Sequence, residues 1–590
     1  GDDMHNSWRA AGYVFGALVV ALPALATSAA AVEPGAPVRL VTKDALIGAA
    51  ARDAVDSLGD LASADKEQLR RLYLDRQDAP LWVDGDGLTS HALAVLSALH
   101  RAEDWGLDAT KLELTAIQQK QADLNAAGES SPTVVAELEA MMTAAVSEYA
   151  RQARTGRINP EDLFSWKFWD QNKKTVDIPK LLADVAKAND AAAAVKALHP
   201  AHPQYHALAK QYAALKRDKA DPRFDVKLPS GPTLKPGMSH PHVATLRKRL
   251  GVEAGETPKS YDDTLIAAVE AFQKKRGLKV DGVIGPNTRN VLNGAAGNRL
   301  ERLLVNLERW RWMPDDLGQY YVNPNVPEYR FRVMDGTRVV HSERIVVGKP
   351  RNATPVFSDK MERIEFNPKW HVPNSIKVEE ILPGLRSGRD TLARSNLRML
   401  DRSGRYVDPL SVNWSATDIR SYHIYQPPGG PNVLGDMKFM FPNKHIVYMH
   451  DTSSKSLFAH ARRAYSHGCM RVRNPREFAR VILARDKGWT MDRINSVIAG
   501  GRLTPVYLDE QVPVHVTYFT ARVDDDGELQ FFDDVYKYDS RTLSALKGKS
   551  LPMLKKSAPR IRAVARDTRP TNRDPLSSFS QWAQNAFGLR

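Results

Sequence analysis

Cysteine is almost absent from this chain of 590 residues, in which Cys469 is the only one. The chain therefore has no intrachain disulfide, and this thiol is a buried spectator, an intermolecular link or a reactive group. Its neighbours are His467 and Gly468 on one side and Arg471 on the other. A histidine and a cation this close favour a reactive thiol, because both can stabilise the thiolate.

Long hydrophobic runs are also scarce, and we find only one. After Arg9 comes the uncharged run 10–31, which begins apolar and ends in small residues. This pattern predicts a signal peptide with A-x-A-like cleavage sites, and an uncleaved anchor is the alternative because the run is about 20 residues long. We expect Met4 to be the natural start and 1–3 to be an expression remnant. Both alternatives export the rest of the chain, where a lone cysteine is unusual.

The excess of positive charge does not identify a partner by itself. The chain has 83 basic and 69 acidic residues, a formal charge of +14. Nucleic acid, anionic lipid and acidic polymers all attract such a surface. Because the basic residues are mostly dispersed and the chain is exported, we do not expect nucleic-acid binding. The length predicts roughly three or four domains.

The first half of the chain is predicted to be helical. Residues 32–230 are rich in alanine and leucine at helical spacing, which predicts a scaffold domain without catalytic spacing. A turn-rich linker leads to a compact unit at 238–297 with three predicted helices and a glycine turn. This unit resembles the small peptidoglycan-binding domain of cell-wall enzymes, with a generic three-helix spacer as the alternative. The matching residues are Leu246, Leu250, Val269, Phe272, Gln273, Gly277, Leu278, Asp281, Gly282, Gly285 and Thr288.

The second half of the chain changes to strand patterns. Residues 303–540 alternate β-branched and aromatic residues between turns, which predicts a mostly-β domain. Polar sequence at 375–421 interrupts this pattern as an insertion, either a lid over a site or a plain surface excursion. The basic segment 547–590 is predicted to be a disordered tail. The fold class expected for the whole chain is multidomain α+β.

Two histidines compete as the base that activates Cys469. His467 is two residues away, about 7 Å along an extended strand, which is long for direct proton transfer. His450 shares a strand face with Tyr448, and if that strand pairs with the one carrying Cys469, facing side chains start about 5 Å apart. We therefore predict His450 as the base, and His467 as a residue behind the site or on its oxyanion side.

The residues around the thiol suggest further roles. Gly468 allows close backbone approach, and the amides of Gly468 and Cys469 could stabilise an oxyanion. Arg471 either holds a substrate carboxylate or the local loop, or makes an ordinary ion pair. A zinc site of His450, His460, His467 and Cys469 is a rival hypothesis, but the spacing matches no common ligand pattern. We expect no cofactor.

The stretch from His450 to Cys469 resembles the YkuD-type L,D-transpeptidase catalytic domain. His450, fifteen intervening residues and then 466–469, Ser-His-Gly-Cys, match its signature, and 435–443 and 370–373 match supporting segments. The whole chain resembles the large Gram-negative periplasmic members of the YcbB type, in which the insertion is a capping subdomain. Smaller relatives commonly have Gly or Ser where Asp451 stands. The group that orients His450 is thus the Asp451 carboxylate, a backbone carbonyl or another side chain.

The resemblance implies a chemistry and a set of partners. Cys469 would attack the L-centre of meso-diaminopimelate in tetrapeptide stems, expel D-alanine and form a thioester that a second stem resolves as a 3→3 cross-link. Tyr448, Ser466, Arg471 and Trp370 are the implied substrate-binding residues. Peptidoglycan stems and glycan, carbapenem inhibitors and candidate cell-wall synthesis enzymes are the implied partners, in the periplasm. The alternatives are L,D-carboxypeptidase or L,D-endopeptidase activity, or a peptidoglycan-binding protein without catalysis.

Overall fold

The computed structural model describes residues 42–554, apart from short gaps at 56–62, 129–130, 172–173, 221–222, 224–225, 255, 276–277 and 294–295. The predicted signal or anchor segment at 1–31 and most of the predicted tail lie outside this part. None of the helices described is both long and apolar enough to cross a membrane.

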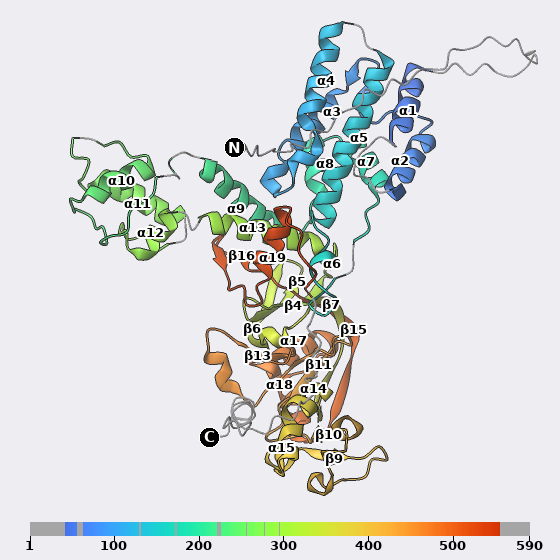
Figure 1. Ribbon diagram of the computed structural model, residues 1–590, viewed down its shortest axis with the longest axis vertical. Helices are drawn as coiled ribbons and strands as arrows, with labels where there is room; N and C mark the ends of the chain where they lie inside the picture. The colour runs from blue at the N-terminus through green and yellow to red at the C-terminus, as the bar shows by residue number, and fades with distance from the viewer. Residues whose placement is uncertain are drawn as a thin grey trace, which may run out of the picture. The chain divides into compact units, whose positions relative to one another are not determined.

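The N-terminal region is a helical domain with its own apolar core, which runs from Ile47 to Leu198. Its longest helix begins with a proline at its first turn and ends at Gly156. Glu139 is buried on this helix and accepts hydrogen bonds from the backbone of the Leu81–Val83 turn. The helices are α1 (Lys43–Ala54), α2 (Ser63–Asp75), α3 (Ser90–Leu99), α4 (Leu114–Ala127), α5 (Pro132–Thr155), α6 (Pro160–Leu163), α7 (Ile178–Lys187) and α8 (Ala191–Ala197), with a hairpin of β1 (Val83–Asp84) and β2 (Gly87–Leu88) (Figure 1).

The helix that follows, within the predicted scaffold range 32–230, belongs to a different core. Helix α9 (Pro203–Ala220) shares an apolar cluster with α13 (Ala296–Trp312) and with Phe519. The small unit between α9 and α13 has its own core and comprises α10 (Pro241–Leu250), α11 (Asp263–Lys275) and α12 (Pro286–Leu292). Its glycine turn is fixed by Gln273, whose side chain binds Asp281 and the backbone of Gly282.

The C-terminal half is organised by a mixed sheet in the strand order β11-β12-β14-β6-β5-β4-β15-β7-β3. A further pairing of β11 with β7 closes this path on itself, and β13 pairs with β6. The apolar residues that it encloses form the main core. The strands are β3 (Trp169–Asp170), β4 (Tyr320–Asn325), β5 (Arg330–Asp335), β6 (Arg338–Gly348), β7 (Val356–Phe366), β11 (Met437–Met440), β12 (Met449–His450), β13 (Ala464–Ser466), β14 (Met470–Val472) and β15 (Thr504–Val516).

The predicted insertion is a subdomain with a core of its own, which we call the cap. Its core runs from Trp370 to Leu434, wider than the predicted 375–421, because the strands that flank the insertion pair with each other. It contains the sheet β8 (Trp370–His371), β10 (His423–Gln426) and β9 (Arg398–Leu400), the helices α14 (Asn374–Ile376), α15 (Leu382–Arg386) and α16 (Thr391–Arg394), and the π-helical turn η6 (Lys377–Ile381).

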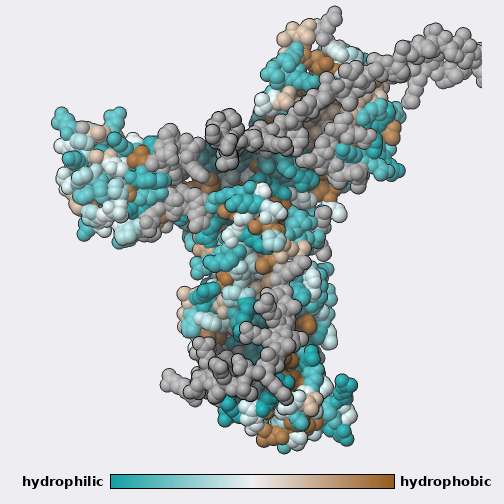
Figure 2. Space-filling view, in the orientation of Figure 1, coloured by the Kyte–Doolittle hydropathy of each residue, from teal (hydrophilic) through white to brown (hydrophobic). Residues whose placement is uncertain are grey.

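Three helices and a hairpin complete this half: α17 (Pro475–Lys487), α18 (Met491–Ala499), α19 (Tyr538–Leu546), and β16 (Ala521–Val523) with β17 (Leu529–Phe531). The predicted disordered tail starts too early, because Leu554 bonds to the backbone of Leu163 and Ser165. On the face shown in Figure 2 the brown hydrophobic patches are small and scattered among hydrophilic residues. This pattern is ordinary for a protein surface and does not locate a site.

Candidate active site

Strand pairing brings the surroundings of His450 and Cys469 together. Strand β12 is parallel to β14, with Met449 beside Met470 and His450 beside Arg471. Both methionines are fully buried in the main core. Because neighbouring residues of a strand point to opposite faces, His450 and Arg471 lie on the other face of the sheet. One step back in the same register, Tyr448 is beside Cys469.

The strand that carries His450 is shorter than predicted. Only Met449 and His450 are in β12, although the pattern predicted a strand from Lys444. Ile446 has a φ of 57°, a left-handed conformation outside the β region, which interrupts a regular strand. The residues just before β12 therefore form a turn next to the thiol.

A backbone carbonyl orients the ring of His450. Nδ1 of His450 is hydrogen-bonded to the carbonyl oxygen of Asp451, which assigns the ring proton to Nδ1 and leaves Nε2 as a proton acceptor. The Asp451 carboxylate is used elsewhere, on the backbone of Asp436 and Thr452 and on Lys455. Of the three alternatives that the sequence left open, the structure has the carbonyl in place.

His450 is buried and has the electrostatics of a neutral base. Burial lowers its pKa to about 3, and the charge of Arg471 acts in the same direction. The bond to the Asp451 carbonyl opposes this shift. The imidazole is therefore neutral at pH 7 and able to accept a proton.

Cys469 is half-buried and directly precedes β14. Its Sγ is 3.9 Å from the carbonyl oxygen of Ile446, a long contact of the kind that a thiol donor makes. Burial raises the pKa of the thiol, and hydrogen bonds from Tyr448 and the charges of Lys438 and Arg471 partly offset this. The resting form is thus a thiol that needs a base.

The turn that carries the thiol is fixed by hydroxyl groups on its inner side. The Ser466 hydroxyl accepts from the Gly468 amide at 3.1 Å and donates to the Cys469 carbonyl at 2.5 Å. The Thr354 hydroxyl donates to the Gly468 carbonyl at 2.8 Å. With that carbonyl held, the Cys469 amide points away from it and bonds to no acceptor in the described residues. A free amide beside the attacking atom is what an oxyanion needs.

His467 contacts the cap. Its Nε2 is 2.7 Å from Oε1 of Glu380, in the π-helical turn of the cap, and 3.3 Å from Nζ of Lys349. The ring is half-buried. The structure thus pairs His467 with charged side chains of two other segments, and gives it no bond to the thiol.

Arg471 carries a charge with no acidic partner within the described part of the chain. It is 9% exposed, and its Nε has no hydrogen-bond partner there. Burial lowers its pKa to about 10, so the guanidinium stays charged at pH 7. Of the sequence alternatives, the ordinary ion pair is absent among the described residues, and the other two, holding a substrate carboxylate or the local loop, stay predictions.

Two of the residues implied as substrate-binding are buried and already make contacts within the protein. Trp370 is 5% exposed and belongs to the core of the cap, so strand alternation turns its neighbour His371 outward. Ser466 is 3% exposed and is occupied by the turn. Tyr448 remains available, because it is half-buried between the cap core and His450, whose ring centroid is 5.7 Å away.

Lys438 was not predicted as a functional residue. It stands beside His450 in the pairing of β11 with β12, and its Nζ is 4.2 Å from the centre of the Tyr448 ring. Glu365 is its acidic partner at 3.7 Å. Thr354 was not predicted as a functional residue either. Lys438 lies in the segment matched at 435–443, but nothing in the sequence shows which side chain of that segment reaches the site.

The described residues do not form the rival zinc site. Within the described residues, no group of three or more His, Cys, Asp or Glu side chains is placed to hold a metal ion. His460 is exposed and bonds to Tyr465.

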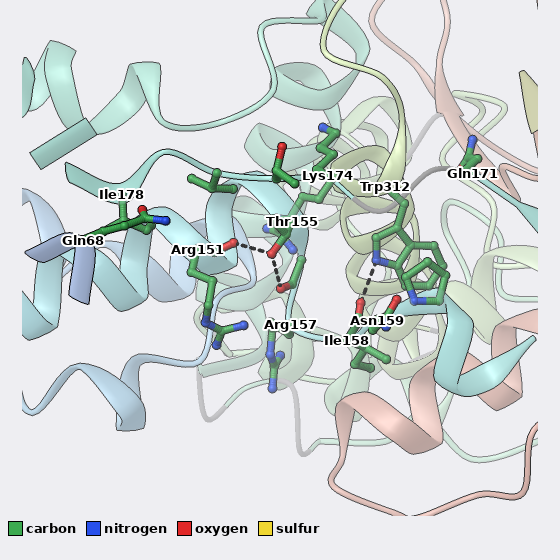
Figure 3. Close-up of a pocket in the computed structure, with 15 residues that line it drawn as sticks. Gln68, Arg151, Thr155, Arg157, Ile158, Asn159, Gln171, Lys174, Ile178 and Trp312 are labelled. Carbon is green, nitrogen blue, oxygen red and sulfur yellow. Dashed lines mark hydrogen bonds between the residues drawn. The ribbon is translucent and has the colours of Figure 1, made fainter. Parts of the chain in front are cut away.

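A cavity of about 480 Å³ is lined by Arg151, Arg157, Lys174 and Trp312 among others (Figure 3). None of the predicted catalytic residues lines this cavity.

Three family models match the chain in sequence order. Residues 67–211 match a "Scaffold domain", 244–292 a "Putative peptidoglycan binding domain" and 319–502 an "L,D-transpeptidase catalytic domain" of the YkuD type. The match to the peptidoglycan-binding model covers most of the unit at 238–297, and the YkuD match includes His450 and Cys469.

Individual relatives agree with these models. A "Putative L,D-transpeptidase" of Haemophilus influenzae is 31% identical over 242 residues, which are 41% of this chain and 49% of that protein, so the chain spans about half of its length. A "Probable N-acetylmuramoyl-L-alanine amidase" of Bacillus licheniformis is 44% identical over 71 residues, 11% of this chain and 20% of that protein. A crystal structure of an L,D-transpeptidase from Xylanimonas cellulosilytica, at 17% identity, covers 49% of this chain and 98% of that one with a TM-score of 0.16, too low to carry an argument. The chain therefore contains a scaffold domain, a peptidoglycan-binding domain and a YkuD-type L,D-transpeptidase catalytic domain, an architecture consistent with multidomain proteins of the YcbB type.

Proposed function

We propose that this protein forms 3→3 cross-links between meso-diaminopimelate residues of peptidoglycan through a thioester on Cys469, with release of D-alanine. The catalytic-domain match and the relative support L,D-transpeptidase activity. The observation that carries the cysteine mechanism is the β12–β14 register, which puts a neutral His450 and Cys469 on one sheet face.

In the acylation step, Nε2 of His450 takes the Sγ proton as Sγ attacks the carbonyl carbon at the L-centre of the donor diaminopimelate. The oxygen of that carbonyl becomes an oxyanion and is stabilised by the free Cys469 amide. When the C–N bond breaks, His450 returns the proton to the departing D-alanine amine. A thioester and free D-alanine are the products.

In the second step, the side-chain amine of another diaminopimelate attacks the thioester. His450 accepts a proton from this amine, the C–S bond breaks, and the proton passes to the sulfur. An amide cross-link forms and the thiol is regenerated. Water in place of the amine gives L,D-carboxypeptidase activity, and attack on an existing cross-link gives the endopeptidase reaction.

Two side chains are proposed to hold the donor stem. Arg471 offers a guanidinium that has no acidic partner among the described residues and suits a stem-peptide carboxylate. Tyr448, with the Lys438 ammonium over its ring, borders the thiol on the side of the cap. The positive charges of Arg471 and Lys438 match the anionic stem peptide.

We place this reaction in the periplasm, after export by the segment at 1–31. The unit at 238–297 would hold the chain on the peptidoglycan, and other cell-wall synthesis enzymes are candidate partners. Carbapenems are expected to acylate Cys469, because a strained β-lactam carbonyl is a substitute for the donor carbonyl.

The test is product analysis with purified protein and a disaccharide-tetrapeptide. Cross-linked dimers formed with loss of D-alanine by the wild type, and not by Cys469→Ala, would support the proposal. Tripeptide alone would assign a carboxypeptidase instead. Turnover that survives in Cys469→Ala would reject the cysteine mechanism, and no turnover by the wild type would leave a peptidoglycan-binding protein.

A further inference from the structure

The turn before β12 holds a strained residue against the nucleophile. Ile446 is β-branched and has a φ of 57°, which costs energy because the side chain crowds the backbone in this region. Its side chain is 79% exposed, so packing does not compensate for the strain. The carbonyl of Ile446 is the group in contact with Sγ of Cys469. Other contacts must therefore hold this residue in place.

Part of the turn is held by Asn443. Its side-chain nitrogen donates to the carbonyls of Phe441 and Val447, and its oxygen accepts from the amides of His445 and Val447. These bonds close the turn, but they do not tie it to the rest of the domain.

A side chain from far upstream makes that connection. Oδ1 of Asp170 is 2.7 Å from Nζ of Lys444, and Oδ2 is 2.8 Å from Nε2 of His445. The two residues that precede Ile446 are thus held by one carboxylate. The ring of Trp166 adds contacts to both, with its centre 5.3 Å from Nζ of Lys444 and 5.4 Å from the centre of the His445 ring.

Asp170 is itself held rigidly. It lies in β3, which is parallel to β7 with Asp170 beside Phe357. Its neighbour Trp169 is 4% exposed in the main core. The segment therefore forms part of the catalytic sheet, although it lies within the scaffold match at 67–211 and far before the catalytic match at 319–502.

Beside this contact the packing is open. A cavity of about 520 Å³ is lined by Asp170, Phe357, Asn443 and His445 among others. The His445 side chain itself is only 4% exposed, and its ring centre is 4.8 Å from that of Phe357. The carboxylate of Asp170 and the rings packed on His445 therefore fix together where the turn sits.

We propose that Asp170 is a positioning residue of the active site, which holds the turn 443–446 so that the Ile446 carbonyl faces the Cys469 thiol. This inference rests on Cys469 being the nucleophile. The carbonyl accepts from the neutral thiol and so keeps the sulfur in one place until His450 removes the proton. Asp170, which lies in the scaffold match, thereby affects the sulfur indirectly, through Lys444 and His445 and the backbone that joins them to Ile446.

The test uses the single cysteine of the full chain as a reporter. Iodoacetamide alkylation against pH measures the thiol pKa of Cys469 directly, since no other cysteine reacts. Asp170→Ala is compared with Asp315→Ala, which removes a similar ion pair, Lys174–Asp315 at 2.8 Å, away from the turn. Lys444→Met is a milder second variant, because its side chain is 57% exposed and we expect its loss to leave the fold intact.

In Asp170→Ala we expect the alkylation midpoint to move to lower pH, because the neutral thiol loses its acceptor. We expect kcat to fall about tenfold with KM within about twofold, the pattern of a misplaced reacting group. Lys444→Met should shift both in the same direction by less, and Asp315→Ala should match the wild type. An unchanged alkylation profile and kcat in Asp170→Ala, at a melting temperature equal to that of Asp315→Ala, would overturn the inference. Turnover by Cys469→Ala would instead reject the proposed nucleophile, which keeps the two failures separate.

Discussion

The two histidines near the thiol differ in what holds them. His450 is 5% exposed, and strand pairing and a backbone carbonyl fix it in the sheet. His467 is closer to Cys469 in the chain, but its ring is half-buried and bound by the Glu380 side chain of the cap. The residue proposed as the base is thus the one held rigidly beside the thiol, and not the one nearest to it in sequence. The position of His467 depends instead on a subdomain with a core of its own.

Removal of the proposed base is expected to have the largest effect. His450→Ala should lower kcat/KM about a thousandfold, because general-base catalysis is typically worth factors of about 10² to 10⁴. Steady-state cross-linking measures this, with His460→Ala as the matched control, since His460 is exposed and bonds to Tyr465. Equal losses in the two variants would remove the distinction between the histidines.

The hydroxyl beneath the nucleophile turn should come next. Thr354→Val removes the donor to the Gly468 carbonyl, so the Cys469 amide loses its orientation and kcat should fall about tenfold. Thr542→Val is the control, because that buried hydroxyl also donates to a carbonyl, but in α19. If both variants lose stability alike and neither loses kcat, Thr354 does not position the oxyanion site.

The contact of His467 with the cap should matter less. Glu380→Gln keeps the size of the side chain and removes its charge, while its hydrogen bond to His467, whose side chain is 19% exposed against 13% for Glu380, can still form. We expect a change in kcat/KM of about threefold, with Glu379→Gln, the exposed neighbour, unchanged. A loss as large as that of His450→Ala would show that His467, and not His450, is the base.

The pH dependence should show the smallest effect. Because burial lowers the pKa of His450 to about 3, the ring stays neutral through the range in which an ordinary histidine is protonated. The kcat/KM for a substrate analogue that does not itself titrate should fall less than about twofold between pH 7 and pH 5. An acid limb with a midpoint near 6.5 would mean that the active base is a solvated histidine.

The same lowered pKa of His450 makes the stability of the fold depend on pH. The unfolded chain protonates His450 at its ordinary pKa, whereas the folded chain protonates it only near pH 3, so the unfolded state binds more protons between these values. The free energy of unfolding should therefore decrease as the pH falls from about 6.5 toward 3. Wild type should lose more stability over this range than His450→Gln, which has no group to protonate there.

The sequence predicted the parts of the site that follow from local pattern. Period-2 alternation put Tyr448 and His450 on one face, and the pairing of that strand with the one that leads from Cys469 was the condition on which the choice of His450 rested. The order of the helical, peptidoglycan-binding and catalytic regions was also predicted, because each region has its own residue pattern. The family models confirm this order.

Contacts between distant segments could not be predicted. Lys438, Thr354 and Asp170 reach the site only because closure of the sheet brings β11, β7 and β3 near it. Strand patterns also concealed α17 and α18, whose short apolar faces lie between strands. The burial of Trp370 in the cap core was not predicted either, because a two-residue strand does not show which of its faces is buried.

The most direct test of the central claim is to trap the acyl-enzyme and locate it. Wild-type protein incubated with the tetrapeptide donor without an acceptor, quenched in acid and digested, should carry the donor stem minus D-alanine on the peptide that contains Cys469, the only thiol of the chain. His450→Ala should accumulate it far more slowly. Cross-linked product with no adduct at Cys469 would contradict the account.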